Sequence, residues 1–301
     1  RGFFVQLKGM LLLISENTKG AFLISLAAAC YVMSDIFMKF LSSEISMFQI
    51  TFLRGLLVTF FLFCYCYISK ASFFITEWKD RIVITIRSIL EVIMTYAFLA
   101  ALFNMNVANA NAILQLIPLM VLLGSFTFLR QSPKTHEWIA VLVGCLGAVI
   151  IIRPGASDFN FFTIHALVAV FCLSARDLIT VRLNKNIPSN IIAFYSALML
   201  TIVSFLLSKD TVHFGEVRNS FFIVYTAIFV SVGYTASVAA MRYGEVTFVS
   251  PFRYTALLWA SVMGFVFFGE IPKFSTLFGG SIIILAGIFI FYKSKDNKKT
   301  L

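Results

Sequence analysis

The chain has 301 residues, of which 60% are hydrophobic and only 13% are charged, with a mean hydropathy of +0.93 and a formal net charge of +10. A soluble domain carries roughly 25% charged residues, so this composition excludes a water-facing surface over a globular domain of this size. The sequence therefore predicts an integral membrane protein.

Ten apolar stretches of about 20 residues, the length that crosses the hydrocarbon core as a helix, follow one another with short connections. A lead-in, 1–19, is expected in the cytoplasm, and a basic cytoplasmic tail covers 294–301. The sequence lacks the roughly 10-residue alternating segments of a membrane β-barrel. The prediction is an all-α bundle of ten transmembrane helices, over 20–41, 47–68, 82–104, 107–129, 136–153, 162–184, 189–208, 220–241, 246–268 and 274–293.

Basic residues are distributed unevenly between the connections on the two sides of the expected membrane. If the N-terminus lies inside, the outer segments hold only Arg153, Lys209, Arg218 and Lys273. The positive-inside rule then places both termini in the cytoplasm. The positive charge orients the protein and contacts anionic lipid, so nucleic acid is not an expected partner. The spacing of cysteine and histidine indicates no metal site, and no cofactor is expected.

The two halves of the chain repeat one another. The stretch "QSPKTHEWIAVLVGCLGAVIII" aligns without a gap with "EIPKFSTLFGGSIIILAGIFIF", and "CYVMSDIFMKFL" aligns with "CLSARDLITVRL", which places Asp35 on Asp177. The repeats are expected over 20–153 and 161–293, joined by a periplasmic segment, 154–160. Each half holds five expected spans, an odd number, so the second half must insert upside down. Transporters with inverted repeats bind their substrate at the repeat interface.

Three motifs resemble the EamA family of the drug/metabolite transporter superfamily. They are "FQITFLRGLL" in the second span, "IIRPG" at the end of the fifth, and "SPFRYTALLWASVMGFVFFGEIP" in the ninth. The resemblance covers about 19–293. It implies a ten-helix inverted-repeat carrier with a central cavity, whose substrate is a metabolite of the amino-acid, nucleoside or S-adenosylmethionine type.

Several charged residues fall well inside the expected spans. Each costs roughly 2.5–3.5 kcal/mol at a helix centre if it is unpaired, so these side chains should face the interior and be compensated there. They are Lys39, Arg54, Arg87, Arg176, Arg253, Asp35, Glu91 and Asp177.

Position along the helices divides these charges into two tiers. Asp35 and Arg54 lie at similar distances from the first outer turn, and we expect an ion pair that either joins two helices or contacts substrate. Arg87, Asp177 and Arg253 form the expected inner tier, in which Arg253 faces Asp177.

Glu91 follows Arg87 by one helical turn and precedes Thr95 by another, so the three share a helix face. A carboxylate near the midplane suits proton coupling. The alternative is a permanent pair between Glu91 and Arg87 with a structural role only.

The predicted substrate site combines these charges with polar and aromatic side chains. Arg253 is expected to hold an anionic group of the substrate, since a guanidinium can bind it bidentately. Glu91 or Asp177 is expected to carry a coupling proton or to meet a substrate cation. The full predicted set is Arg253, Tyr254, Gln115, Asp177, Glu91, Arg87, Trp259, Tyr195, Tyr234 and Asn111.

These features favour a secondary carrier in the bacterial inner membrane that works by alternating access, as a monomer or a dimer. Its expected partners are a small amphipathic or zwitterionic metabolite, membrane lipid and coupled protons. A phosphate-binding loop for ATP and the clusters of an intramembrane enzyme are not found in the sequence, so we expect no enzymatic activity. The alternatives are a flippase for a lipid-linked substrate, a membrane scaffold without transport, and a channel.

Overall fold

The computed structural model describes residues 16–105, 107–130, 134–152, 161–208 and 217–269, with short pieces at 274, 278–282, 285–286 and 289. Most of the expected lead-in, the joint at 154–160, most of the expected span at 274–293 and the tail at 294–301 lie outside these residues. The described residues fold into helices, which are α2 (Glu16–Leu41), α3 (Met47–Ile68), α4 (Trp78–Asn104), α5 (Val107–Leu114), α6 (Ile117–Phe128), α7 (Thr135–Ile152), α8 (Phe162–Thr180), α9 (Ser189–Leu207), α10 (Val217–Tyr243), α11 (Val246–Val249), the 3-10 helix η1 (Ser250–Tyr254) and α12 (Thr255–Phe268).

Among the described residues, six helices are long and apolar enough to cross a membrane: α2, α3, α4, α8, α9 and most of α10. In hydrocarbon every backbone polar group needs an internal partner, which a helix supplies within its own segment. The distribution of side chains is the reverse of that in a soluble protein. Large apolar side chains such as Phe22, Ile68 and Leu206 are exposed, whereas charged ones such as Arg176 and Glu91 are buried. This arrangement fits a surface that faces lipid.

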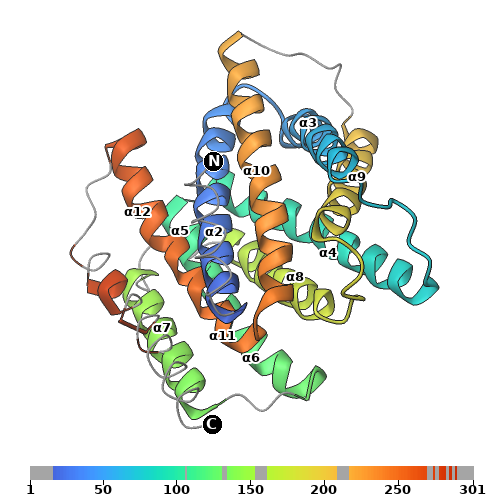
Figure 1. Cartoon of the computed structure of the whole chain (residues 1–301). Coiled ribbons are helices and arrows are strands. Elements are labelled where there is room, and N and C mark those ends of the chain that lie inside the picture. The colour runs from blue at the N-terminus through green and yellow to red at the C-terminus, as the bar shows by residue number, and fades with distance from the viewer. Residues whose placement is uncertain are drawn as a thin grey trace, which may run out of the picture.

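The helices pack in pairs that relate the two halves of the chain. Helix α2 lies against α10 and α4 lies against α8, while α3 lies against α9 (Figure 1). At the α3–α9 contact the hydroxyls of Thr59 and Thr201, 142 residues apart, are 3.0 Å from each other. The ring pairs Phe52–Phe205 and Phe63–Phe194 flank the same contact. The 142-residue offset that separates the threonines also relates Phe52 to Phe194 and Phe63 to Phe205. The two ring pairs are therefore equivalent in the repeat, and the two halves are built alike here.

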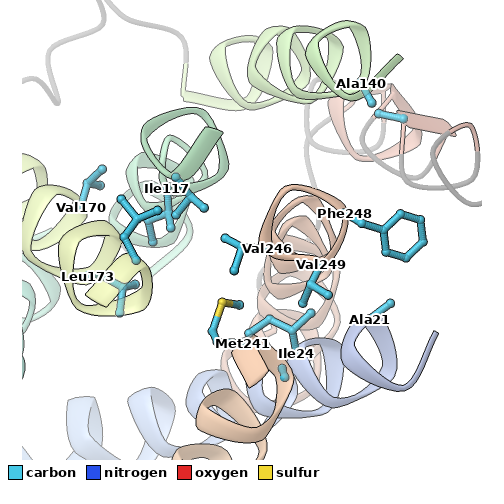
Figure 2. Packing of buried hydrophobic residues seen from close by; sticks show 14 of the residues in the cluster. Ala21, Ile24, Ile117, Ala140, Val170, Leu173, Met241, Val246, Phe248 and Val249 are labelled. Atoms are coloured by element: carbon cyan, nitrogen blue, oxygen red, sulfur yellow. The ribbon is translucent and has the colours of Figure 1, made fainter. Parts of the chain in front are cut away.

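A cluster of aliphatic side chains joins α2 to the broken region of the second half. Figure 2 shows Ile24 of α2 beside Met241 of α10, with Val246 and Val249 of α11 close by. All four are at most 2% exposed. Gly20 permits this approach, because a Cβ there would lie 2.6 Å from the Val249 side chain. The close packing fixes α11 and η1 against α2, and thereby positions Arg253.

The expected spans at 107–129 and 246–268 are not continuous helices, which corrects the prediction. The first consists of α5 and α6 with a turn between them, and the second consists of α11, η1 and α12. Pro118 and Pro251 explain the breaks, because proline has no N–H to donate to the preceding turn. Val107 and Val246, which begin the two broken segments, align in the repeat.

Candidate functional site

A cavity of about 120 Å³ lies between helices of both halves and is large enough for several water molecules. Side chains from α2, α3, α4, α5, α6, α8, α10, η1 and α12 contribute to its wall. The breaks of both discontinuous segments border it, through Leu114 and Gln115 on one side and Arg253 and Ala256 on the other. The polar side chains in the wall are Tyr31, Ser34, Asp35, Arg54, Glu91, Thr95, Asn111, Gln115, Arg176, Tyr234 and Arg253.

Arg176 is the centre of a buried ion network. Its Nη1 donates to Oε2 of Glu91 at 2.6 Å, which joins α8 to α4. Its Nη2 and Nε donate to Oδ1 of the neighbouring Asp177 at 2.9 and 3.2 Å. All three residues are at most 2% exposed. Planar guanidinium geometry lets one arginine satisfy two carboxylates at once, and each bond is strengthened by charge.

The structure brings Arg253 and Asp177 together, as the sequence indicates. The Arg253 Nη2 donates to Oδ2 of Asp177, so this carboxylate is shared between two arginines on different elements, α8 and η1. The second half of the chain therefore supplies three of the four residues in the network.

Arg87 does not join Asp177 and Arg253 as the expected inner tier predicts, because its guanidinium contacts hydroxyls instead of a carboxylate. Its Nε donates to Oγ1 of Thr180 at 2.9 Å, and its Nη1 donates to Oγ of Ser196. Glu91, one turn further along α4, pairs with Arg176, so the expected alternative of an intrahelical Arg87–Glu91 pair is not formed. Arg87 is 3% exposed and does not line the cavity.

Asp35 and Arg54 line the same cavity but differ from the expected direct pair. Among the ion pairs within 4.0 Å in the described part of the chain, neither residue takes part. Asp35 instead interacts with Arg54 through longer-range attraction and also with the side chain of Asn111.

Several buried polar atoms that face this cavity have no hydrogen-bond partner among the described residues. Three belong to donors: the hydroxyls of Tyr31 and Ser34, and Nε of Arg253. Two are acceptors, namely Oε1 of Glu91 and Oε1 of Gln115. An unsatisfied buried polar group costs roughly 1–3 kcal/mol, and more if it is charged. The cavity is therefore suited to a ligand or water that both donates and accepts hydrogen bonds.

Three aromatic residues of the predicted site lie away from the cavity wall. The Tyr254 ring fits against Gly144 of α7, and its hydroxyl donates to the Val141 carbonyl at 3.2 Å. The Tyr195 hydroxyl donates to the carbonyl of Phe73 at 2.7 Å. Trp259 is 37% exposed on the outer side of α12. The two tyrosine rings are used in helix packing, and backbone carbonyls satisfy their hydroxyls.

Tyr234 does line the cavity, next to Tyr31, a residue that the sequence analysis did not select. The two rings meet edge to face with centroids 6.1 Å apart. The Tyr31 ring packs against Gly233, where a Cβ would lie 3.0 Å from the ring, so the absence of a side chain at this position makes room for the ring. Tyr31 carries no charge and sits in an apolar run, and no pattern in the sequence distinguishes it from a packing residue.

Arg176 was also absent from the predicted site, although it was counted among the intramembrane charges. The residue that aligns with Arg176 in the first half is Ser34, which has no charge, so the repeat does not indicate the role of Arg176. A usable signal did exist. An intramembrane arginine needs a compensating acid, and Glu91 had no assigned partner on another helix.

No group of three or more His, Cys, Asp or Glu able to hold a metal ion occurs among the residues that the structure describes. The five cysteines are free thiols on four different helices.

Comparisons with known proteins agree with this architecture. The EamA-like transporter family matches residues 18–153 and again 161–292. An S-adenosylmethionine uptake transporter of Rickettsia bellii is 26% identical over 280 residues, covering 92% of this chain and 94% of that protein. A solved crystal structure has the same fold, with a TM-score of 0.75 at 15% identity, over 92% of this chain and 98% of that one.

Other relatives carry different substrates. The pseudopaline exporter CntI of Pseudomonas aeruginosa is 24% identical over 275 residues, covering 89% of this chain and 94% of that protein. A riboflavin transporter of Vibrio cholerae is 27% identical over 207 residues, which cover 68% of this chain and 70% of that protein. All are transporters rather than enzymes. With both of its halves matched, the chain belongs to the EamA-like transporter family of the drug/metabolite transporter superfamily and is a multi-pass membrane transporter.

Proposed function

We propose that the protein is a secondary carrier that moves a small zwitterionic or amphipathic metabolite across the bacterial inner membrane by alternating access. The observation that carries the proposal is the set of unpartnered donors and acceptors in the cavity wall. A purely apolar substrate would leave these groups unsatisfied, whereas a substrate with both a cationic and an anionic end satisfies both kinds.

The charges around the cavity support the same substrate class. Three arginines, Arg54, Arg176 and Arg253, are balanced by three acids, Asp35, Glu91 and Asp177, so the formal charge of this set is zero. A ligand with little net charge enters such a site without leaving an uncompensated charge in a low-dielectric interior.

Two residues are assigned to the ends of the substrate. Arg253 is proposed to hold the anionic group through its unpartnered Nε, while its Nη2 stays with Asp177. Glu91 is proposed to meet the cationic group or to carry a proton, because Oε1 is unpartnered. Both oxygens of Asp177 are already engaged by arginines, so Glu91 is preferred for this role. Gln115, Tyr234 and Asn111 are proposed to orient the remainder.

The proposed topology has ten spans in two inverted repeats of five, with both termini in the cytoplasm. Paired contacts between the halves support it: α2 with α10, α4 with α8, and α3 with α9. The two discontinuous segments begin at aligned residues and border the cavity. Helices broken at a substrate site are typical of inverted-repeat transporters.

Reconstitution of the purified chain into proteoliposomes tests the proposed function. The panel would contain amino acids, nucleosides, S-adenosylmethionine, riboflavin and organic anions, each labelled and added outside. We expect saturable uptake of at least one zwitterionic member, accelerated when the same compound is preloaded inside, because a carrier exchanges substrate. Flux that rises linearly with concentration and shows no such exchange would indicate a channel instead.

Substitution of Glu91 with glutamine tests proton coupling. The glutamine amide keeps the size of the side chain and a hydrogen bond to Arg176, but it cannot bind a proton near neutral pH. Groups that interact with Glu91 are Arg176, Tyr31, Tyr234 and Arg87. The expected result is uptake that loses its pH dependence and no longer responds to an imposed proton gradient. A pH profile that matches the wild type would assign Glu91 a structural role only.

A further inference from the structure

Arg54 is a buried guanidinium for which the helices supply no direct partner. It lies on α3, is 6% exposed and lines the cavity. Its side chain takes part in none of the hydrogen bonds or ion pairs found in the described part of the chain. A buried charge that lacks hydrogen bonds costs several kcal/mol, so the fold is expected to bring such a group to a ligand.

Comparison with the other buried arginines makes Arg54 distinctive. Arg176 binds Glu91 and Asp177, and Arg253 binds Asp177. Arg87 has no carboxylate either, yet the hydroxyls of two other helices satisfy it outside the cavity wall. Among the described residues, Arg54 is thus the arginine of this group that has no hydrogen-bonded partner for any of its donors, whereas Arg253 binds Asp177 and has an unpartnered Nε.

The neighbours of Arg54 place it in a different part of the wall from Arg253. Arg54 interacts electrostatically with Asp35 and with Tyr234. Arg253 is bound to Asp177 beside Arg176. Two separate guanidinium donors therefore border one cavity, and the Glu91 acceptor also faces it.

We propose that Arg54 is a second anion-binding residue of the transport cavity, and that the substrate carries two oxyanion groups, one at Arg54 and one at Arg253, with a cationic group between them. The second oxyanion is a carboxylate or a phosphate, since either matches the guanidinium fork. The inference rests on the proposed function, because it treats this cavity as the transport site. It adds the substrate class, an acidic amino acid or a compound of that charge pattern.

The charge balance is consistent with this class. A substrate with two oxyanions and one ammonium carries a net charge of about −1 when each oxyanion is a carboxylate. The three arginines and three acids around the cavity sum to zero when Asp177, which does not line it, is counted, so one proton bound together with the substrate restores neutrality. Binding of the acidic substrate and of a proton would then favour each other.

Matched ligand pairs test the proposal on the full-length protein in detergent, by thermal shift and by titration calorimetry. The first pair is L-glutamate and L-glutamine, which differ in one carboxylate, and the second is O-phosphoserine and serine, which differ in one phosphate. In the wild type the acidic member of at least one pair should bind about 10- to 100-fold more tightly, as a hydrogen-bonded charge supplies. The pair that shows the preference identifies the oxyanion.

Two variants complete this test. Arg54→Gln should reduce the preference for the acidic member to about onefold. Arg182→Gln makes the same chemical change at an exposed arginine that contacts the Phe128 carbonyl, and it should keep the preference. Equal binding of both members by the wild type, binding of none of the four, or an Arg54→Gln variant that keeps the preference would each overturn the proposal.

A labelling experiment does not depend on a variant that folds. Phenylglyoxal modifies accessible guanidinium groups, and peptide mass spectrometry of the native protein measures the modification of each arginine. We expect Arg54 to be modified faster than Arg176, and the acidic probe to slow it at least tenfold, with no effect of the neutral probe. Modification of Arg54 that ignores the acidic probe contradicts the assignment. If Arg54 fails these tests while proteoliposomes still exchange substrate, the proposed carrier function stands and only the second anion site is lost.

Discussion

Substitution of Arg176 with leucine should destabilise the protein by roughly 3–5 kcal/mol, the cost of removing one partner from a buried ion pair. Glu91 would lose its only ion-pair partner among the described residues, and Asp177 would keep Arg253 alone. The expected measurements are a lower melting temperature in detergent and a lower yield of folded protein in membranes.

The double variant Arg176→Leu with Glu91→Leu separates stability from function. When both members of a buried pair are replaced by apolar groups, stability is often restored, so the double variant should melt closer to the wild type than the single one does. Transport should nevertheless stay absent, because the proposed cation- or proton-binding carboxylate is gone. A single Arg176→Leu variant as stable as the wild type would remove Arg176 from the centre of the network.

Substitution of Arg253 with alanine should abolish transport but leave a folded, membrane-inserted protein. Asp177 retains two hydrogen bonds from Arg176, so its charge is not left alone. The loss of a charged hydrogen bond to the substrate corresponds to a reduction of uptake on the order of 10- to 100-fold or more. Uptake by proteoliposomes and the melting temperature together measure the two effects.

Arg253→Lys is the matched variant for this residue. Lysine keeps the positive charge beside Asp177, but it lacks the Nε–H that is unpartnered in the cavity. We therefore expect wild-type stability with strongly reduced uptake. Wild-type uptake by the alanine variant would show that Arg253 serves the fold and not the substrate.

The sequence alone predicts the helices, the burial of the intramembrane charges and the contact of Arg253 with Asp177. Each follows from one physical rule: an apolar span must be helical, and a charge within it must find a partner. Spacing along a helix gives the depth of a side chain in the membrane. For Arg253 and Asp177, equal depth was sufficient to predict their contact.

Depth alone does not identify which of several nearby charges will pair. Arg176 and Asp177 are adjacent in sequence, so their Cβ atoms point about 100° apart on the helix, and the pair forms because the arginine side chain is long enough to bend back. Asp35 and Arg54 have suitable depths and attract each other, yet they form none of the ion pairs within 4.0 Å in the described part of the chain, and Asn111 from a third element also acts on the carboxylate. Tyr254 is adjacent to Arg253 but turns into the space left by Gly144. These outcomes depend on how helices from distant parts of the chain pack.

The ion network also bears on how such a chain arises by duplication. Arg176, Asp177 and Arg253 all come from the second half, and Glu91 comes from the first. At the position that aligns with Arg176 the first half has Ser34. Two copies of the first half would contain no counterpart of Arg176 for Glu91, and two copies of the second would contain no Glu91. The two halves are therefore complementary, and a symmetric pair made of either half alone is expected to lack this network.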